Sequence, residues 1–118
     1  MGMIQKHLLS YKYAFRGIWL AFRYEQNMAI HVLAASTVMI VNYILDVTKT
    51  EWLVTLILIG VVWTAEIFNT AVEKLADRVT KEWDPLIAHA KDLAAGAVLI
   101  ICIVAVVCAA IIYLPYFF

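Results

Sequence analysis

Three long apolar segments limit what this chain can fold into. They cover residues 29–47, 52–72 and 93–114, and each approaches or exceeds the roughly 20 residues that cross the hydrocarbon core of a bilayer. Backbone N–H and C=O groups in lipid must be hydrogen-bonded within their own segment, so each segment is predicted to be a helix. The sequence therefore predicts an all-α integral membrane protein with three transmembrane helices.

Length and composition agree with a single membrane-embedded domain over residues 1–118. The chain has 118 residues, of which 65% are hydrophobic. A soluble domain of this length could not enclose so much apolar surface in one core. The formal net charge is zero, so overall charge gives no indication of a nucleic-acid partner, and none is predicted.

The segments that flank the spans carry helix signals of their own. Residues 4–26 alternate basic and large apolar side chains, which predicts an amphipathic helix lying in the membrane interface. Asp84 and Pro85 are typical of the N-cap and first position of a helix, which is expected to run into the third span. Pro115 and the aromatic tail after it predict the exit from that helix.

The basic residues predict the orientation of the chain in the membrane. Eight of the nine Lys and Arg residues lie before the first span or between the second and third, and only Lys49 lies on the opposite side. Short loops rich in Lys and Arg stay in the cytoplasm. The N-terminus and a loop over residues 74–92 are therefore predicted to be cytoplasmic.

The second span carries a polar stripe within the stretch "TAEIFNTAVEKLAD". Glu66, Asn69, Glu73 and Asp77 fall within an arc of about 80° when the stretch is helical. Glu66 lies about 21 Å along the helix from Trp52, which keeps it in or at the edge of the hydrocarbon. Glu73 and Asp77 are expected to emerge at the cytoplasmic interface.

The depth of each acid suggests a different chemical role. An ionisable group within a membrane normally faces the protein interior or a wet cavity, so Glu66 is a plausible general base for a membrane-bound hydroxyl. Glu73, nearer water, suits Mg²⁺, which takes one or two carboxylates together with phosphate oxygens. The alternative is that Glu66 and Asn69 only join helices through hydrogen bonds.

Two further positions on the cytoplasmic side could contribute. Lys91 and Asp92 precede a patch of small residues at 94–97, and Lys91 is either a phosphate contact or an ordinary cytoplasmic anchor. Glu25, at the junction of the interfacial helix with the first span, is either a second metal carboxylate or a solvated glutamate. Each of these roles stays open on the residues alone.

Several common signals are absent from the sequence. There is no P-loop, dinucleotide-binding or protein-kinase catalytic-loop pattern. His7, His31 and His89 share no metal-ligand spacing, and no chemistry is predicted for them. Any nucleotide would have to be held by a carboxylate-bound metal ion and a few basic groups.

Three stretches together resemble a known family over essentially the whole chain. "FRYEQN", "EIFNTAVEKLADRVT" and "HAKDLAAGAVLI" are similar to the prokaryotic diacylglycerol kinases, which are small kinases of the bacterial cytoplasmic membrane. The pattern E-x-x-N-[TS]-[AS]-[IV]-E…D, followed by A-K-D, is specific to this family. The closer likeness is to its Gram-positive branch, which acts as undecaprenol kinase.

The resemblance implies an assembly, cofactors and a set of site residues. It implies a homotrimer whose active sites are shared between neighbours at the cytoplasmic face, with ATP as phosphoryl donor and Mg²⁺ as cofactor. Glu66 and Asn69 match the catalytic residues, and Glu25 and Glu73 the metal ligands. The positions matching nucleotide contacts, with Lys6 standing where arginine is expected, are Lys6, Tyr13, Glu25, Glu73, Glu82, Trp83, Asp84, Lys91 and Asp92.

The lipid substrate is inferred from the same resemblance. Glu66 and Ala95 match lipid-substrate positions, and Ala95 stands where the diacylglycerol-using enzymes carry serine. This favours phosphorylation of undecaprenol to undecaprenyl phosphate, with a diacylglycerol kinase making phosphatidic acid as the alternative. A more distant alternative is a non-enzymatic channel or transporter that uses Glu66 as its intramembrane carboxylate.

Overall fold

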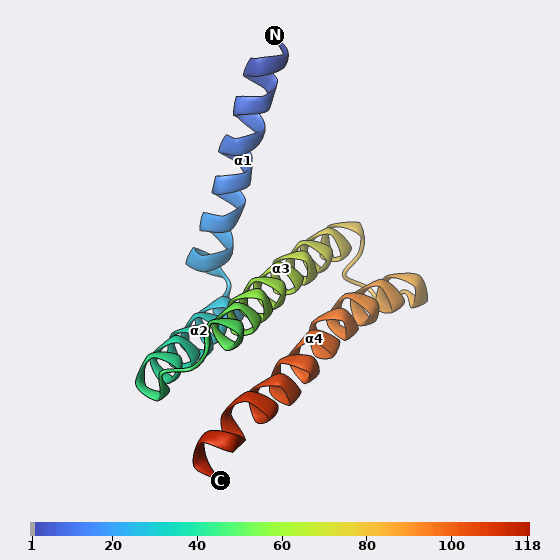
Figure 1. Ribbon diagram of the computed structural model, residues 1–118. Coiled ribbons are helices and arrows are strands. Elements are labelled where there is room, and N and C mark those ends of the chain that lie inside the picture. The colour runs from blue at the N-terminus through green and yellow to red at the C-terminus, as the bar shows by residue number, and fades with distance from the viewer. Residues whose placement is uncertain (1) are drawn as a thin grey trace.

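The chain folds into helices throughout the part that the structure describes. The structure is a computed structural model that describes residues 2–118; residue 1, the first of the predicted domain, lies outside the described residues. The helices are α1 (Met3–Tyr24), α2 (Gln26–Leu45), α3 (Lys49–Val79) and α4 (Pro85–Phe117) (Figure 1). By length and composition α2, α3 and α4 could each cross a membrane, which confirms the predicted all-α class with three spans.

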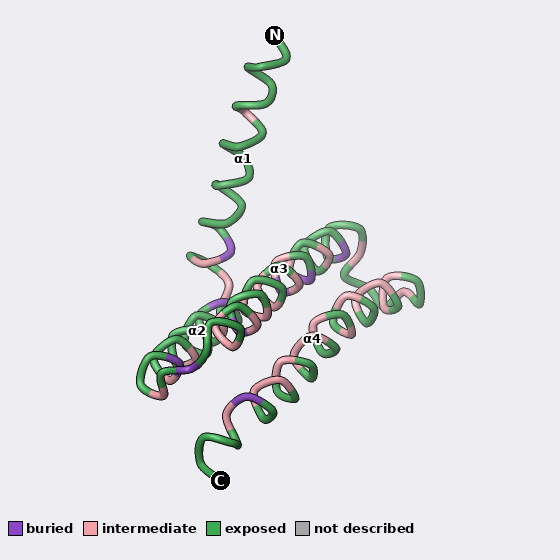
Figure 2. Tube along the Cα trace, viewed as in Figure 1, coloured by how far each residue is buried: buried purple, intermediate pink, exposed green. Residues whose placement is uncertain are grey.

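The helices form a compact three-helix part and one projecting helix. α3 and α4 lie antiparallel and side by side, α2 packs on α3, and α1 points away from all three (Figure 1). α1 is exposed along nearly its whole length, with Ala21 its one buried residue (Figure 2). Its last turn is attached to α3 by the Phe22 ring, which packs edge-on against Trp63 with 5.0 Å between centroids.

A short connection turns the chain from α2 into α3. Asp46 ends α2 in the left-handed conformation with φ of 52°, which aspartate tolerates better than most residues. Thr48 then caps α3: its Oγ1 accepts from the Glu51 N–H at 3.2 Å, and Glu51 Oε1 accepts from the Thr48 N–H at 3.0 Å. These reciprocal bonds satisfy backbone donors at the start of the helix.

The predicted start of the last helix is confirmed. Asp84 is the N-cap of α4, and its Oδ1 accepts from the N–H groups of Leu86 at 2.9 Å and Ile87 at 3.2 Å. Pro85 follows at the first helical position, where its missing N–H costs no hydrogen bond.

The prediction of a cytoplasmic loop over residues 74–92 is wrong in its extent. α3 continues to Val79 and α4 begins at Pro85, so only residues 80–84 are not helical. Five of the six residues in 73–78 are Glu, Lys, Leu, Ala and Arg, which have high intrinsic helix propensity. With 31 residues α3 is about 46 Å long, so it extends beyond a hydrocarbon core of about 30 Å.

The expected exit from the last helix at Pro115 is also wrong. α4 runs through Pro115 to Phe117, and the Phe118 N–H still bonds the Leu114 carbonyl at 3.1 Å. A proline in the last turn removes one backbone hydrogen bond and leaves the turns before it intact. α4 can therefore continue through Pro115 to Phe117.

A buried polar network joins the three long helices at the end remote from the 80–84 connection. The Asn42 side chain, fully buried on α2, donates from Nδ2 to Thr55 Oγ1 at 2.9 Å. The Tyr113 hydroxyl of α4 donates to Asn42 Oδ1. Polar groups in a membrane interior need such partners, so this network fixes how α2, α3 and α4 pack.

Removing one hydroxyl from this network should measure its contribution. We expect Tyr113→Phe to lower the free energy of unfolding by about 1 kcal/mol, the typical size of an interhelical hydrogen bond in a membrane. Thermal unfolding in detergent micelles would detect the change. Tyr43→Phe on α2 is the matched control, because Tyr43 is 83% exposed. Equal shifts for the two variants would contradict a stabilising role for the network.

Candidate active site

Glu66 is the buried acid of α3, and its partners come from α2. It is 4% exposed. Asn27 donates from Nδ2 to Glu66 Oε1 at 3.2 Å, and His31 Nε2 lies 3.2 Å from Glu66 Oε2. Each carboxylate oxygen therefore has a protein partner in place of bulk water. The same bonds join α2 to α3, so Glu66 also contributes to helix packing.

Asn69 and Glu73 continue the polar face toward water. Asn69 is 7% exposed and donates from Nδ2 to Glu73 Oε1 at 3.2 Å, whereas Glu73 itself is exposed. The Asn69 Oδ1 atom is buried and accepts no hydrogen bond from any residue in 2–118. Asn69 thus contacts Glu73 rather than Glu66, and its carbonyl oxygen is available to a donor that enters the site.

Glu25 lies next to the turn of α3 that carries Glu73. Its Oε1 is 3.1 Å from Lys74 Nζ, and this ion pair ties the α1–α2 junction to α3. Glu25 and Lys74 also line a groove of about 440 Å³ between α1 and α3. The structure therefore brings the two predicted metal carboxylates to the same end of α3.

The donor set can be compared with what Mg²⁺ requires. No group of three or more His, Cys, Asp or Glu side chains gathers anywhere in residues 2–118. Mg²⁺ usually binds through one or two carboxylates and completes its shell with waters and substrate phosphates. The two carboxylates that Glu25 and Glu73 place at the same end of α3 would fit this requirement, with Glu25 Oε1 paired with Lys74 and Glu73 Oε1 accepting from Asn69.

Lys91 and Asp77 form an ion pair between α4 and α3 near the 80–84 connection. The Lys91 Nζ lies 2.8 Å from Asp77 Oδ1. This hydrogen bond and the charge of Lys91 hold the pKa of the Asp77 carboxyl below its usual range, and Asp77 raises the pKa of Lys91 in return. Both groups therefore stay charged at neutral pH, and Lys91 is a cation held beside the 80–84 connection.

The connection between α3 and α4 holds three of the predicted nucleotide contacts. Trp83 is 82% exposed, and Glu82 is exposed, with its N–H bonded to Thr80 Oγ1 at 3.1 Å. Asp84 uses one carboxylate oxygen to cap α4. Asp92, exposed on the first turns of α4, lies beyond the connection.

Three predicted site residues are not brought to the polar face of α3. Lys6 and Tyr13 lie on the part of α1 that projects away from the other helices (Figure 1). Ala95 is exposed on α4. Because α3 and α4 are antiparallel and Asp77 pairs with Lys91, the register sets Ala95 level with Glu73 rather than with Glu66.

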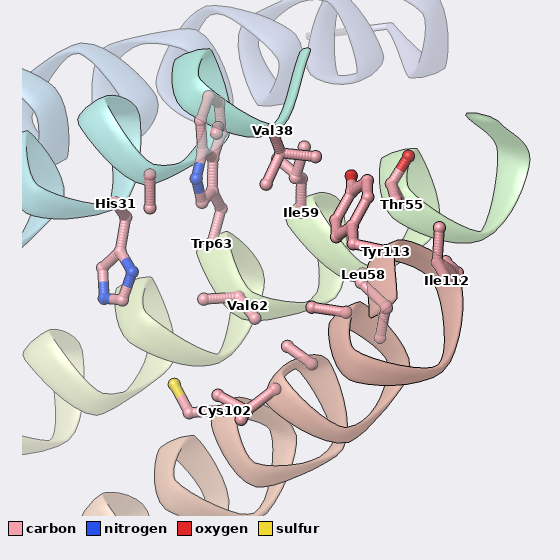
Figure 3. Close-up of a pocket in the computed structure, with 15 residues that line it drawn as sticks. His31, Val38, Thr55, Leu58, Ile59, Val62, Trp63, Cys102, Ile112 and Tyr113 are labelled. Atoms are coloured by element: carbon pink, nitrogen blue, oxygen red, sulfur yellow. The ribbon is translucent and has the colours of Figure 1, made fainter. Parts of the chain in front are cut away.

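An apolar cavity of about 230 Å³ lies between α2, α3 and α4. Apolar side chains of the three helices make up most of its wall, including Val62, Trp63 and Cys102 (Figure 3). His31 lines one end, and Thr55 and Tyr113 line the other (Figure 3). Because His31 also contacts Glu66, the cavity ends next to the buried acid.

Sequence reasoning missed two residues of this site, Asn27 and His31. No chemistry was predicted for His31, because the three histidines share no metal-ligand spacing. A signal was nevertheless present: Asn27 and His31 are four residues apart and therefore share one helix face, which also includes the fully buried Asn42. A polar stripe on an otherwise apolar span indicates the face that meets another polar group.

The fold and the site together define a multi-pass membrane protein in which one helix, α3, both lines an apolar cavity and carries the buried Glu66 and the exposed Glu73. Residues 12–113 match the sequence model of the family described as Prokaryotic diacylglycerol kinase. This match covers most of the chain, and the protein belongs to that family.

Named relatives cover nearly the whole chain. It is 35% identical to the Undecaprenol kinase of Bacillus subtilis over 112 residues, which are 95% of this chain and 91% of that protein. It is 33% identical to the Diacylglycerol kinase of Synechocystis, over 92% of this chain and 62% of that protein. With the Diacylglycerol kinase of Haemophilus influenzae the identity is 31%, over 91% of this chain and 92% of that protein.

Family membership establishes the class of reaction. The protein is a lipid kinase, a phosphotransferase that acts on an alcohol, with ATP as the phosphoryl donor and a divalent metal ion as cofactor. The predicted enzyme class is thereby confirmed, and the alternative of a channel or transporter is set aside.

Proposed function

We propose that this lipid kinase phosphorylates undecaprenol at the cytoplasmic face of the bacterial membrane, with Mg²⁺ as its metal ion. The observation that carries the proposal is the position of Glu66, which is buried against His31, a residue that lines one end of an apolar cavity, and which lies seven residues before the exposed Glu73 on the same helix. The 35% identity to a protein named Undecaprenol kinase supports this lipid, and diacylglycerol remains the alternative.

In this proposal Glu66 is the general base. Its carboxylate accepts the proton of the lipid hydroxyl as the hydroxyl oxygen bonds to the γ-phosphorus of ATP. The bond from that phosphorus to the β,γ-bridging oxygen breaks, and ADP leaves. Phosphoryl transfer depends mainly on positioning and on neutralisation of charge, so a short helical chain can provide what it needs.

The remaining roles follow from the position of each side chain. Asn69 orients Glu73 through its Nδ2 donor and offers Oδ1 to a hydroxyl or water in the site. Glu25 and Glu73 would hold Mg²⁺, which when bound neutralises phosphate charge. Lys91 adds a positive charge at the same end of the molecule.

The arrangement in the membrane is part of the proposal. We place the N-terminus and the 80–84 connection in the cytoplasm, because eight of the nine basic residues are on that side. α1, which is exposed and carries basic and large apolar residues, would lie in the cytoplasmic interface. A homotrimer with shared sites would let a neighbouring chain supply the contacts that Lys6 and Tyr13 do not make here.

A lipid-dependence assay tests this function. Purified protein in mixed micelles should consume ATP with Mg²⁺ only when a lipid alcohol is added. We expect undecaprenol to be used about tenfold better than diacylglycerol in kcat/KM, which corresponds to about 1.4 kcal/mol of transition-state stabilisation. An equal or higher kcat/KM with diacylglycerol would contradict undecaprenol as the preferred substrate. An ATP consumption rate that does not change when either lipid is added would refute the proposed activity.

A further inference from the structure

Two side chains of α2 hold the two oxygens of Glu66 separately. Asn27 Nδ2 donates to Oε1 and His31 Nε2 contacts Oε2, each at 3.2 Å. Asn27 and His31 are one helical turn apart, so a single face of α2 presents both groups. This double contact fixes the rotation of the carboxylate group as well as its position.

The chemistry of the pair determines which atom donates. An ionised carboxylate can only accept hydrogen bonds, so a proton must lie on His31 Nε2 when Glu66 is ready to act as a base. Each carboxylate oxygen has two lone-pair directions, and the two contacts use one on each oxygen. One direction per oxygen therefore remains for a substrate hydroxyl.

His31 also links the acid to the apolar cavity. Its side chain is 19% exposed and lines one end of the cavity (Figure 3), and the Glu66 side chain that it contacts is 5% exposed. A histidine is an unusual choice for an apolar wall, since a buried polar group is costly unless it has a partner. Within residues 2–118 its side-chain partner is Glu66.

We propose that His31 is a positioning residue for Glu66, and that Asn27 assists it. The imidazole Nε2–H and the amide Nδ2–H hold the carboxylate so that its remaining lone pairs face the hydroxyl at the end of the cavity. This inference rests on the proposed role of Glu66 as the general base. It adds two residues that orient the Glu66 carboxylate, Asn27 and His31. Both belong to α2 and not to the acidic face of α3.

Substitutions at His31 separate positioning from packing. In His31→Leu the donor is lost, and we expect kcat with undecaprenol in mixed micelles to fall about tenfold or more, since small misplacements of reacting groups can cost about 100-fold. The KM for MgATP should stay unchanged, because His31 is not among the nucleotide contacts. His31→Gln keeps an N–H donor that can reach Glu66 and should recover most of kcat.

Controls keep this test independent of folding. Thr37→Ala on the same helix should behave like the parent protein, because Thr37 is exposed and bonds only the Leu33 carbonyl of its own helix. If His31→Leu loses its thermal unfolding transition, His31→Asn takes its place. Its amide is too short to reach Glu66, so kcat should again fall while the glutamine variant keeps activity.

The outcomes separate this proposal from the proposed function. Absence of lipid-dependent activity in the parent protein would refute the proposed function. Activity in the Glu66→Gln variant would refute the role of Glu66 as the general base. If both of those results come out as expected but His31→Leu keeps full kcat, or raises the KM for MgATP instead, the positioning role is refuted. Addition of His31→Leu to Glu66→Gln should cause no further loss, because His31 acts only through Glu66.

Discussion

Glu66→Gln is expected to abolish lipid phosphorylation while the protein remains folded and binds MgATP. Loss of a general base typically costs about 10²- to 10⁴-fold in rate, and the amide cannot take the hydroxyl proton. The measurement is kcat with undecaprenol in mixed micelles, together with MgATP affinity from equilibrium binding. Affinity should be unchanged, because Glu66 is not among the proposed nucleotide contacts and lies seven residues before Glu73, the contact proposed on α3.

The local structure explains why this variant should fold. The glutamine carbonyl oxygen can still accept from Asn27 Nδ2, and its amide can donate to His31 when the imidazole proton moves to Nδ1. No buried donor or acceptor is then left without a partner. A Glu66→Gln enzyme with near-parental kcat would show that the base lies elsewhere, whereas loss of the thermal transition would point to a role in packing.

Much of the fold could be predicted because membrane helices satisfy simple local rules. The three spans follow from the length of apolar segments, and the start of α4 follows from an aspartate and proline pair. The acidic face of α3 follows from spacing alone, because a helix of known pitch fixes which side chains share a side. The structure adds that this face runs from the buried Glu66 to the exposed Glu73.

The partners of that face could not be predicted in the same way. Spacing within α3 does not say which face of α2 packs against it, so the contacts of Glu66 with Asn27 and His31 depend on tertiary packing. The ion pairs of Lys74 with Glu25 and Lys91 with Asp77 likewise join segments remote in sequence. The extent of the connection given as 74–92 was overestimated, because α3 continues to Val79 and α4 already begins at Pro85.

Glu73→Gln is expected to weaken MgATP binding about 100-fold while leaving the fold intact, because the carboxylate that we propose as a Mg²⁺ ligand is replaced by a neutral amide. Glu73 is exposed, its side chain accepts a hydrogen bond from Asn69, and the glutamine carbonyl oxygen can keep that bond. Titration of activity with Mg²⁺ at fixed ATP should shift to higher Mg²⁺, with lipid KM little changed.

The same substitution at the opposite end of α3 shows whether this effect is local. Glu51→Gln also removes one carboxylate from α3, but Glu51 bonds Tyr116 and the Thr48 backbone at the end remote from Glu25 and Lys91. If the effect at Glu73 arose from the overall charge of the chain, both variants would raise the KM for MgATP equally. If Glu73 holds the metal ion, only Glu73→Gln will shift the Mg²⁺ titration, and an unshifted curve for that variant removes Glu73 from the metal site.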